Sequence, residues 1–164
     1  MRTAILRLGA ERRTAFALCV SMLLVFSSFS LYIMAEDPEP DAATLKQLSI
    51  AETQHEIIQL LIQKEQYAKA MEEYRAILEL NLPEKYEEAV FKEIAIVTKK
   101  LYERGQKEYA YQALAMGFSA IQGVEFKARV LNIKASLLKK DGRIDEAIKV
   151  YRQEVDIREK GDSK

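Results

Sequence analysis

From about residue 44 onward, the hydrophobic and polar positions of this chain repeat with the period of an α-helix. Apolar residues recur three and four positions apart, and short polar stretches or single glycines separate the runs. Pro83 is the only proline after residue 40, so the pattern favours helices joined by tight turns and leaves no room for a sheet. The spacing predicts an all-α fold with six helices, over residues 45 or 51 to 64, 67–80, 84–103, 106–121, 124–140 and 143–158.

Two of the predicted helices repeat the same short phrase. The second has Ala70 and Tyr74, and the sixth has Ala147 and Tyr151, so that an aromatic residue follows a small one by one helical turn. A weaker copy, Ala110 with Leu114, stands between them. A small residue lets two helices approach closely, and the large residue one turn later fills the space beyond that contact. The repetition indicates a stacked helical array.

These motifs resemble the tetratricopeptide repeat, most closely in the segment LNIKASLLKKDGRIDEAIKVYRQEV at 131–155. The resemblance implies three tandem helix–turn–helix hairpins that form a short right-handed solenoid over residues 44–158. The chain departs from the family at Ile58 and Glu65, and the spacing slips to 40 and 37 residues, so an ordinary helical bundle stays an alternative. The packing positions that the resemblance implies are Tyr67, Ala70, Tyr74, Gly105, Ala110, Leu114, Ala135, Leu138, Gly142, Ala147 and Tyr151.

The resemblance also implies where a partner binds, because the first helices of such hairpins line a groove. Lys99, Arg129 and Lys139 would make one end of this groove basic and suited to an acidic segment or a free carboxylate, with Asn132 bonding a peptide backbone. A solvated helix face without a ligand is the alternative. The groove residues expected from the register are His55, Gln59, Lys92, Lys99, Tyr102, Arg129, Asn132 and Lys139.

A second possible surface lies on the last helix. Val150 and Ile157 are seven residues apart and off the main apolar seam, which suggests a patch for self-association into a homo-oligomer. Isolated exposed apolar residues are normal, and they are the alternative explanation.

The N-terminal 35 residues differ from the rest. Residues 14–35 contain no charge, follow four arginines and precede an acidic stretch, which predicts a transmembrane anchor with the remainder exported. A cleaved signal peptide is the alternative. The protein would then be inner-membrane anchored with an exported domain, or periplasmic or secreted. We expect residues 36–43 to form an acidic spacer with two prolines and residues 159–164 a polar tail.

Composition argues against catalysis, metal binding and nucleic acid. His55 is the only histidine, Cys19 is the only cysteine, and residues 36–164 carry a net charge of about −3. No cofactor or metal is predicted. The sequence predicts a non-catalytic protein–protein interaction scaffold. A self-assembling structural subunit of an envelope complex is the main alternative, and a small enzyme or metalloprotein is a weaker one.

Overall fold

The structure is a computed structural model that describes residues 40–161, and this part of the chain is entirely helical. It has six α-helices, one 3-10 turn (η2, Glu84–Tyr86) and no strand, as the sequence predicts. None of these helices is both long enough and apolar enough to cross a membrane. The predicted membrane segment, residues 14–35, lies outside the described residues. The helices are α2 (Ala42–Gln63), α3 (Tyr67–Leu78), α4 (Glu87–Glu103), α5 (Lys107–Ala120), α6 (Val124–Lys140) and α7 (Ile144–Gly161).

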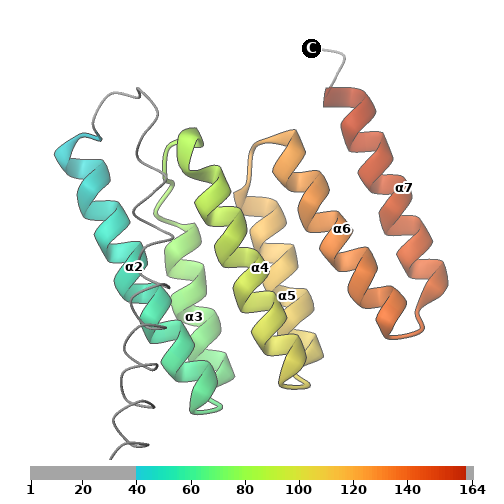
Figure 1. Ribbon diagram of the computed structural model, residues 1–164, viewed down its shortest axis with the longest axis horizontal. Coiled ribbons are helices and arrows are strands. Elements are labelled where there is room, and N and C mark those ends of the chain that lie inside the picture. The colour runs from blue at the N-terminus through green and yellow to red at the C-terminus, as the bar shows by residue number, and fades with distance from the viewer. Residues whose placement is uncertain (1–39, 162–164) are drawn as a thin grey trace, which may run out of the picture. The chain divides into compact units, whose positions relative to one another are not determined.

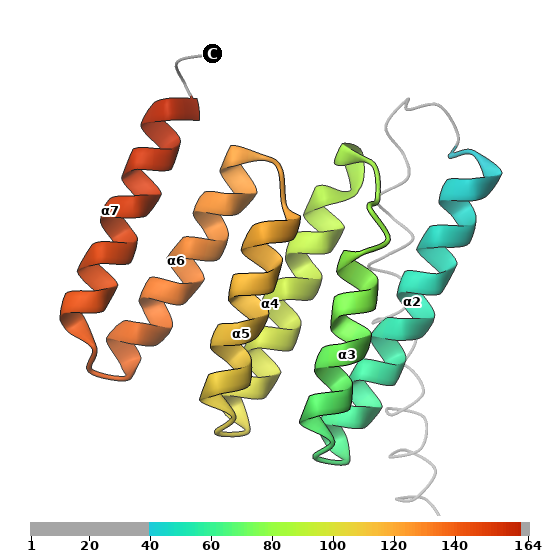
Figure 2. The same ribbon diagram turned by 180° about the vertical axis from the view of Figure 1, so that it is seen from behind.

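The six helices form three antiparallel hairpins that lie side by side: α2 with α3, α4 with α5, and α6 with α7 (Figure 1). The first helices pack on one another in the order α2, α4, α6, and α3 packs on α5 behind them, as the opposite view shows (Figure 2). This arrangement is consistent with a helical solenoid of the tetratricopeptide type.

All three hairpins turn in the same way. In each turn, one residue has a positive φ: Glu65 at 59°, Gly105 at 76° and Gly142 at 74°. The next N–H reaches back to a carbonyl five residues earlier at 2.9 Å, the pattern of a Schellman motif. The donors and acceptors of these bonds are Gln66 to Leu61, Gln106 to Leu101 and Arg143 to Leu138. The shared geometry fixes the repeat register at 40 and then 37 residues.

The small residues of the repeated phrase lie where the helices meet most closely. Ala70, Ala110 and Ala147 are all buried, and each lies five residues after the positive-φ residue of its turn. In the second hairpin Gly117 allows an even closer approach, because a Cβ there would lie 2.6 Å from side-chain atoms of Ile94. Leu114, Ala135 and Leu138, which the sequence also predicts as packing residues, are buried as well.

The hydrophobic core has two parts. The larger part runs through the first two hairpins and takes Val130 and Leu137 from α6. The smaller part lies between α6 and α7 and is built on Leu131, Ala135 and Leu138 of α6. α6 therefore joins two cores with two of its faces.

Element boundaries differ from the expected ones by three residues at most when the first helix is counted from residue 45, and those of α6 coincide with them. α2 begins at Ala42, inside the predicted spacer, because the carboxylate of Asp41 caps it by accepting a 2.7 Å bond from the Thr44 N–H. α7 continues to Gly161 and takes in the first residues of the predicted tail.

Three sequence predictions for α7 are wrong. Tyr151 is not a buried packing residue, since 36% of its surface is exposed. Val150 and Ile157 do not form an exposed patch: Val150 is buried, and Ile157 is partly buried against the α6–α7 core. The reason is a rotation of the α7 seam, because α7 packs on α6 through Ala147 and Val150 and the Tyr151 side of the helix has no neighbour within the described residues.

The first turn offers a test of the shared geometry. Glu65 adopts the left-handed conformation that glycine adopts in the other two turns, and a Cβ there is unfavourable. We expect Glu65→Gly to raise the free energy of unfolding, measured by urea denaturation, by about 0.5–1 kcal/mol. This is the gain from removing the Cβ, less the cost of the larger conformational entropy that glycine gives the unfolded chain. The matched change Gly105→Ala should destabilise the second turn. A loss of stability in Glu65→Gly would contradict the shared geometry.

Candidate binding surface on the first helices of the hairpins

The face formed by α2, α4 and α6 contains the residues that the sequence predicts as a groove. Between α2 and α4, His55 Nδ1 lies 2.5 Å from the carboxylate of Glu93, which is nearly buried. This hydrogen bond raises the pKa of His55, against the opposing effect of partial burial. Next to it, Lys100 donates to the side-chain oxygen of Gln59. His55 and Gln59 therefore join neighbouring first helices.

Between α4 and α6, the face is built on aromatic rings. The guanidinium of Arg129 lies 4.0 Å from the ring centroid of Phe91 and 5.4 Å from that of Phe126. The two rings contact each other with centroids 5.8 Å apart. Such a cation–π stack fixes the position of the guanidinium and leaves its N–H donors for another partner. No acidic side chain within residues 40–161 pairs with Arg129.

The strongest polar contact between the second and third hairpins is at Asp141, the residue that caps the end of α6. Its carboxylate accepts hydrogen bonds from Lys107 Nζ at 2.6 Å and from the hydroxyls of Tyr102 and Tyr111, both at 2.8 Å. These donors, Lys107 first, lower the pKa of Asp141 to about 2. The hydrogen bond to Asp141 raises the pKa of Tyr102, and burial followed by the same kind of bond raises that of Tyr111.

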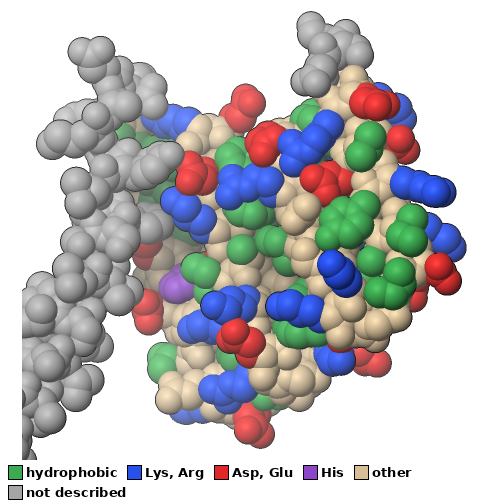
Figure 3. Space-filling view, turned by 45° about the vertical axis from the view of Figure 1, so that its right-hand side comes forward, with side chains coloured by type: hydrophobic (Ala, Val, Ile, Leu, Met, Phe, Trp, Pro, Cys, Tyr) green, Lys and Arg blue, Asp and Glu red, His purple; other side chains and the backbone are tan. Residues whose placement is uncertain are grey.

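The other predicted groove residues fall into two groups. Lys92 lies 3.0 Å from Glu88, Lys99 lies 3.9 Å from Glu103, and the side chain of Lys99 is 73% exposed. Lys139 is also exposed. Asn132 instead donates to Glu154 of α7 at 3.2 Å, so it links the two helices of the third hairpin. Lys and Arg side chains are spread over this side of the molecule among hydrophobic and acidic ones (Figure 3).

All the predicted groove residues lie on first helices, but several of them connect helices. Sequence reasoning missed the partners that decide this: Glu93, Lys100 and Asp141. The position of Glu93 could have been found from the sequence, because in the stacked register this carboxylate faces a neighbouring first helix. The 40-residue offset between hairpins places it opposite α2.

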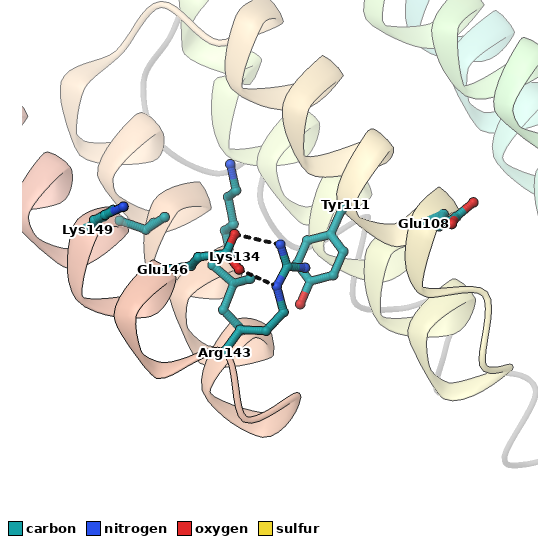
Figure 4. Close-up of a pocket in the computed structure, with 8 residues that line it drawn as sticks. Glu108, Tyr111, Lys134, Arg143, Glu146 and Lys149 are labelled. Carbon is teal, nitrogen blue, oxygen red and sulfur yellow. Dashed lines mark hydrogen bonds and ion pairs between the residues drawn. The ribbon is translucent and has the colours of Figure 1, made fainter.

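A cleft lies between α5 and the third hairpin (Figure 4). Its volume is about 560 Å³. Within it, the Arg143 guanidinium donates two bonds to Glu146, at 2.7 and 2.6 Å, and lies 5.4 Å from the ring of Tyr111. The cleft is lined by Glu108, Tyr111, Lys134, Leu138, Arg143, Glu146, Lys149 and Val150.

The repeat register shows a change of side-chain type at this cleft. Val90 and Val97 of α4 correspond, 37 residues later, to Lys127 and Lys134 of α6. Val97 is fully buried, whereas the ammonium of a lysine at the same place must reach water. Lys134 lines the cleft at a position that is apolar in the second hairpin. Side chains of both signs line the cleft, which identifies no single ligand class.

The described residues show no constellation for metal chemistry. Across residues 40–161, no group of three or more His, Cys, Asp or Glu side chains could hold a metal ion.

The Tetratricopeptide repeat family model matches the chain twice, over residues 51–83 and 128–160. These segments cover most of the first hairpin and the third, and the second hairpin between them repeats their turn geometry. No curated protein and no solved structure matches the chain. The two matches and the all-helical stack support the tetratricopeptide repeat family, whose fold is generally non-catalytic and suggests a protein–protein interaction scaffold.

The Asp141 cluster predicts a specific loss of stability in acid. Folding lowers the pKa of the Asp141 carboxyl from 3.8 to about 2. The contribution of this carboxylate to the free energy of unfolding is therefore complete above about pH 4 and is lost as the pH falls toward 2. Asp141→Asn should therefore be less stable than wild type near pH 6, and this gap should shrink between pH 4 and 2. Urea denaturation across this range measures it.

Asp156→Asn, an exposed carboxylate on α7, is the matched control and should show little gap at any pH. A gap for Asp141→Asn that stays constant down to pH 2 would contradict the role assigned to the carboxylate.

Proposed function

We propose that this chain is a non-catalytic scaffold that holds a partner protein through an extended acidic segment. The segment would lie on the face formed by α2, α4 and α6. The observation that supports this most directly is Arg129, whose guanidinium is held on Phe91 and Phe126 and pairs with no acidic side chain of the described residues. An arginine held in this way is suited to bind a carboxylate through two parallel hydrogen bonds.

Two exposed lysines on the first helices favour the same ligand class. Lys99 and Lys139 are exposed on α4 and α6, and Lys99 has only a long contact of 3.9 Å to Glu103. These cations lie on a domain that is slightly acidic overall. Asn132 has no part in this site, because it bonds to Glu154.

The proposal includes a location, which rests on the residue pattern alone. Residues 14–35 would anchor the chain in a membrane, or would be removed as a signal peptide, and the helical domain would work outside the cytoplasm. The scaffold would then hold its partner next to the membrane or in the exported compartment.

Charge reversal on the face tests the proposal. The probe is a set of fluorescent twelve-residue peptides with a free C-terminal carboxylate, identical except for an acidic, neutral or basic side-chain composition. We expect the full-length protein to bind the acidic peptides best and more weakly at higher salt, because screening reduces the attraction. Arg129→Glu and Lys99→Glu should each weaken binding about tenfold or more in fluorescence anisotropy, the loss of one charge-assisted contact.

Arg152→Glu is the matched control, since it reverses the charge of an exposed arginine on α7 and should leave binding unchanged. Circular dichroism checks that each variant is folded; Lys99→Glu is an exposed change that leaves the aromatic stack intact. Equal binding of acidic and basic peptides, or equal binding by wild type and Lys99→Glu, would overturn the proposed face.

A further inference from the structure

Within residues 40–161, no other helix covers the outer side of α7, which is an apolar stripe. Its four large residues follow each other at intervals of four, three and four, which places them on one helix face. They are Ile144, 50% exposed, Ile148, 44% exposed, Tyr151, 36% exposed, and Val155, 53% exposed. An exposed stripe of this size on a helix that ends a stack is a candidate interface.

The register between hairpins shows what such a stripe does elsewhere in the same molecule. The turns at Glu65 and Gly142 are 77 residues apart, so the stripe corresponds to Tyr67, Met71, Tyr74 and Leu78 of α3. In α3 these residues pack into the core that the following hairpin shares. Tyr74 is fully buried, and its hydroxyl donates to the carbonyl of Ala113 in α5 at 3.1 Å. The α7 stripe therefore has the apolar composition of a helix face that packs against another hairpin.

The opposite end of the stack offers a matching surface. α2 exposes Ile50, Ile57 and Leu60. By the 40-residue offset between the first two turns, Ile50 and Ile57 correspond to Val90 and Val97 of α4. In α4 these two valines belong to the larger core, where Val97 is fully buried.

The two ends carry apolar residues at the positions that are apolar at the junction between the first and second hairpins. One side of that junction has Met71 and Tyr74, and α7 has Ile148 and Tyr151 at the same positions. The other side has valines, and α2 has isoleucines where α6 has Lys127 and Lys134. A contact between α7 of one copy and α2 of another would therefore be apolar on both sides, whereas the cleft between α5 and the third hairpin is lined by charged residues such as Lys134.

We propose that copies of this chain associate head to tail, with the α7 stripe of one copy covered by the α2 stripe of the next. The contact is heterologous, because each copy uses a different surface toward each neighbour, so association can continue beyond two copies. It continues the internal packing of the array from one chain to the next, and it does not involve the cations proposed to bind a peptide.

Sedimentation velocity of the full-length protein in a mild detergent tests this over a range of concentrations. Wild type should show mass that rises with concentration past the dimer. We call the α7 stripe the tail surface and the α2 stripe the head surface. A tail-surface variant, Ile148→Glu with Tyr151→Glu, and a head-surface variant, Ile57→Glu, should each remain monomeric. Ile96→Glu, on α4 between the two ends, changes an isoleucine of nearly equal exposure and should associate like wild type.

Mixing the variants separates the outcomes. The tail-surface variant keeps an intact α2 stripe, and the head-surface variant keeps an intact α7 stripe. An equimolar mixture should therefore form a dimer of the two variants and nothing larger. Monomeric wild type at all concentrations would overturn the proposal. Association unchanged in both variants, as contacts through residues 14–35 would give, or loss in the tail-surface variant alone, as a symmetric α7–α7 contact would give, would also overturn it.

Discussion

Each hairpin of this chain depends on the next hairpin to bury one side of its second helix. In α3 the dependent side includes Tyr74, which is covered so completely that its hydroxyl must find the carbonyl of Ala113. A buried hydroxyl without a partner would be costly, so the apolar contact also fixes a polar one. The same constraint acts at α7, where no hairpin of the described residues follows and the corresponding tyrosine is exposed. Repeat arrays gain most of their stability from such nearest-neighbour contacts, and they leave unsatisfied surface at their ends.

The two junctions inside the array differ because of a few side chains. The first has the fully buried Val97 in α4, together with the polar contacts that His55 and Gln59 make. The second has Lys134 at the equivalent position and stays open as a cleft, while Asp141 binds Tyr102, Lys107 and Tyr111 across it. The third hairpin is therefore held by polar contacts and by one face of α6. Both junctions therefore contain contacts that depend on pH, through His55 and Glu93 in the first and through Asp141 in the second.

The stacking of hairpins also decides which polar residues of the first helices are available to a ligand. The first helices face one side, and there the side chains that could meet a ligand are also those that join neighbouring helices. His55 is bound to Glu93 and Gln59 to Lys100, so these residues set the spacing of α2 and α4. Arg129 differs, because aromatic rings hold it and its hydrogen-bond donors have no acidic partner in the described residues. A binding role thus depends on which polar residues the stacking leaves unpaired.

The sequence by itself determined the six helices, the three turns and the small residues at the close contacts. These follow from local rules: apolar spacing, the left-handed turn conformation, and the short reach of an alanine side chain such as that of Ala110. Only the tertiary structure decided that Val150 is buried and Tyr151 exposed, that Asn132 turns to α7, and that Asp141 gathers three donors. The reason is that helical spacing tells which residues share a face, but not which neighbour covers that face. Coverage depends on the tilt and separation of whole hairpins, which the spacing of residues within one helix does not specify.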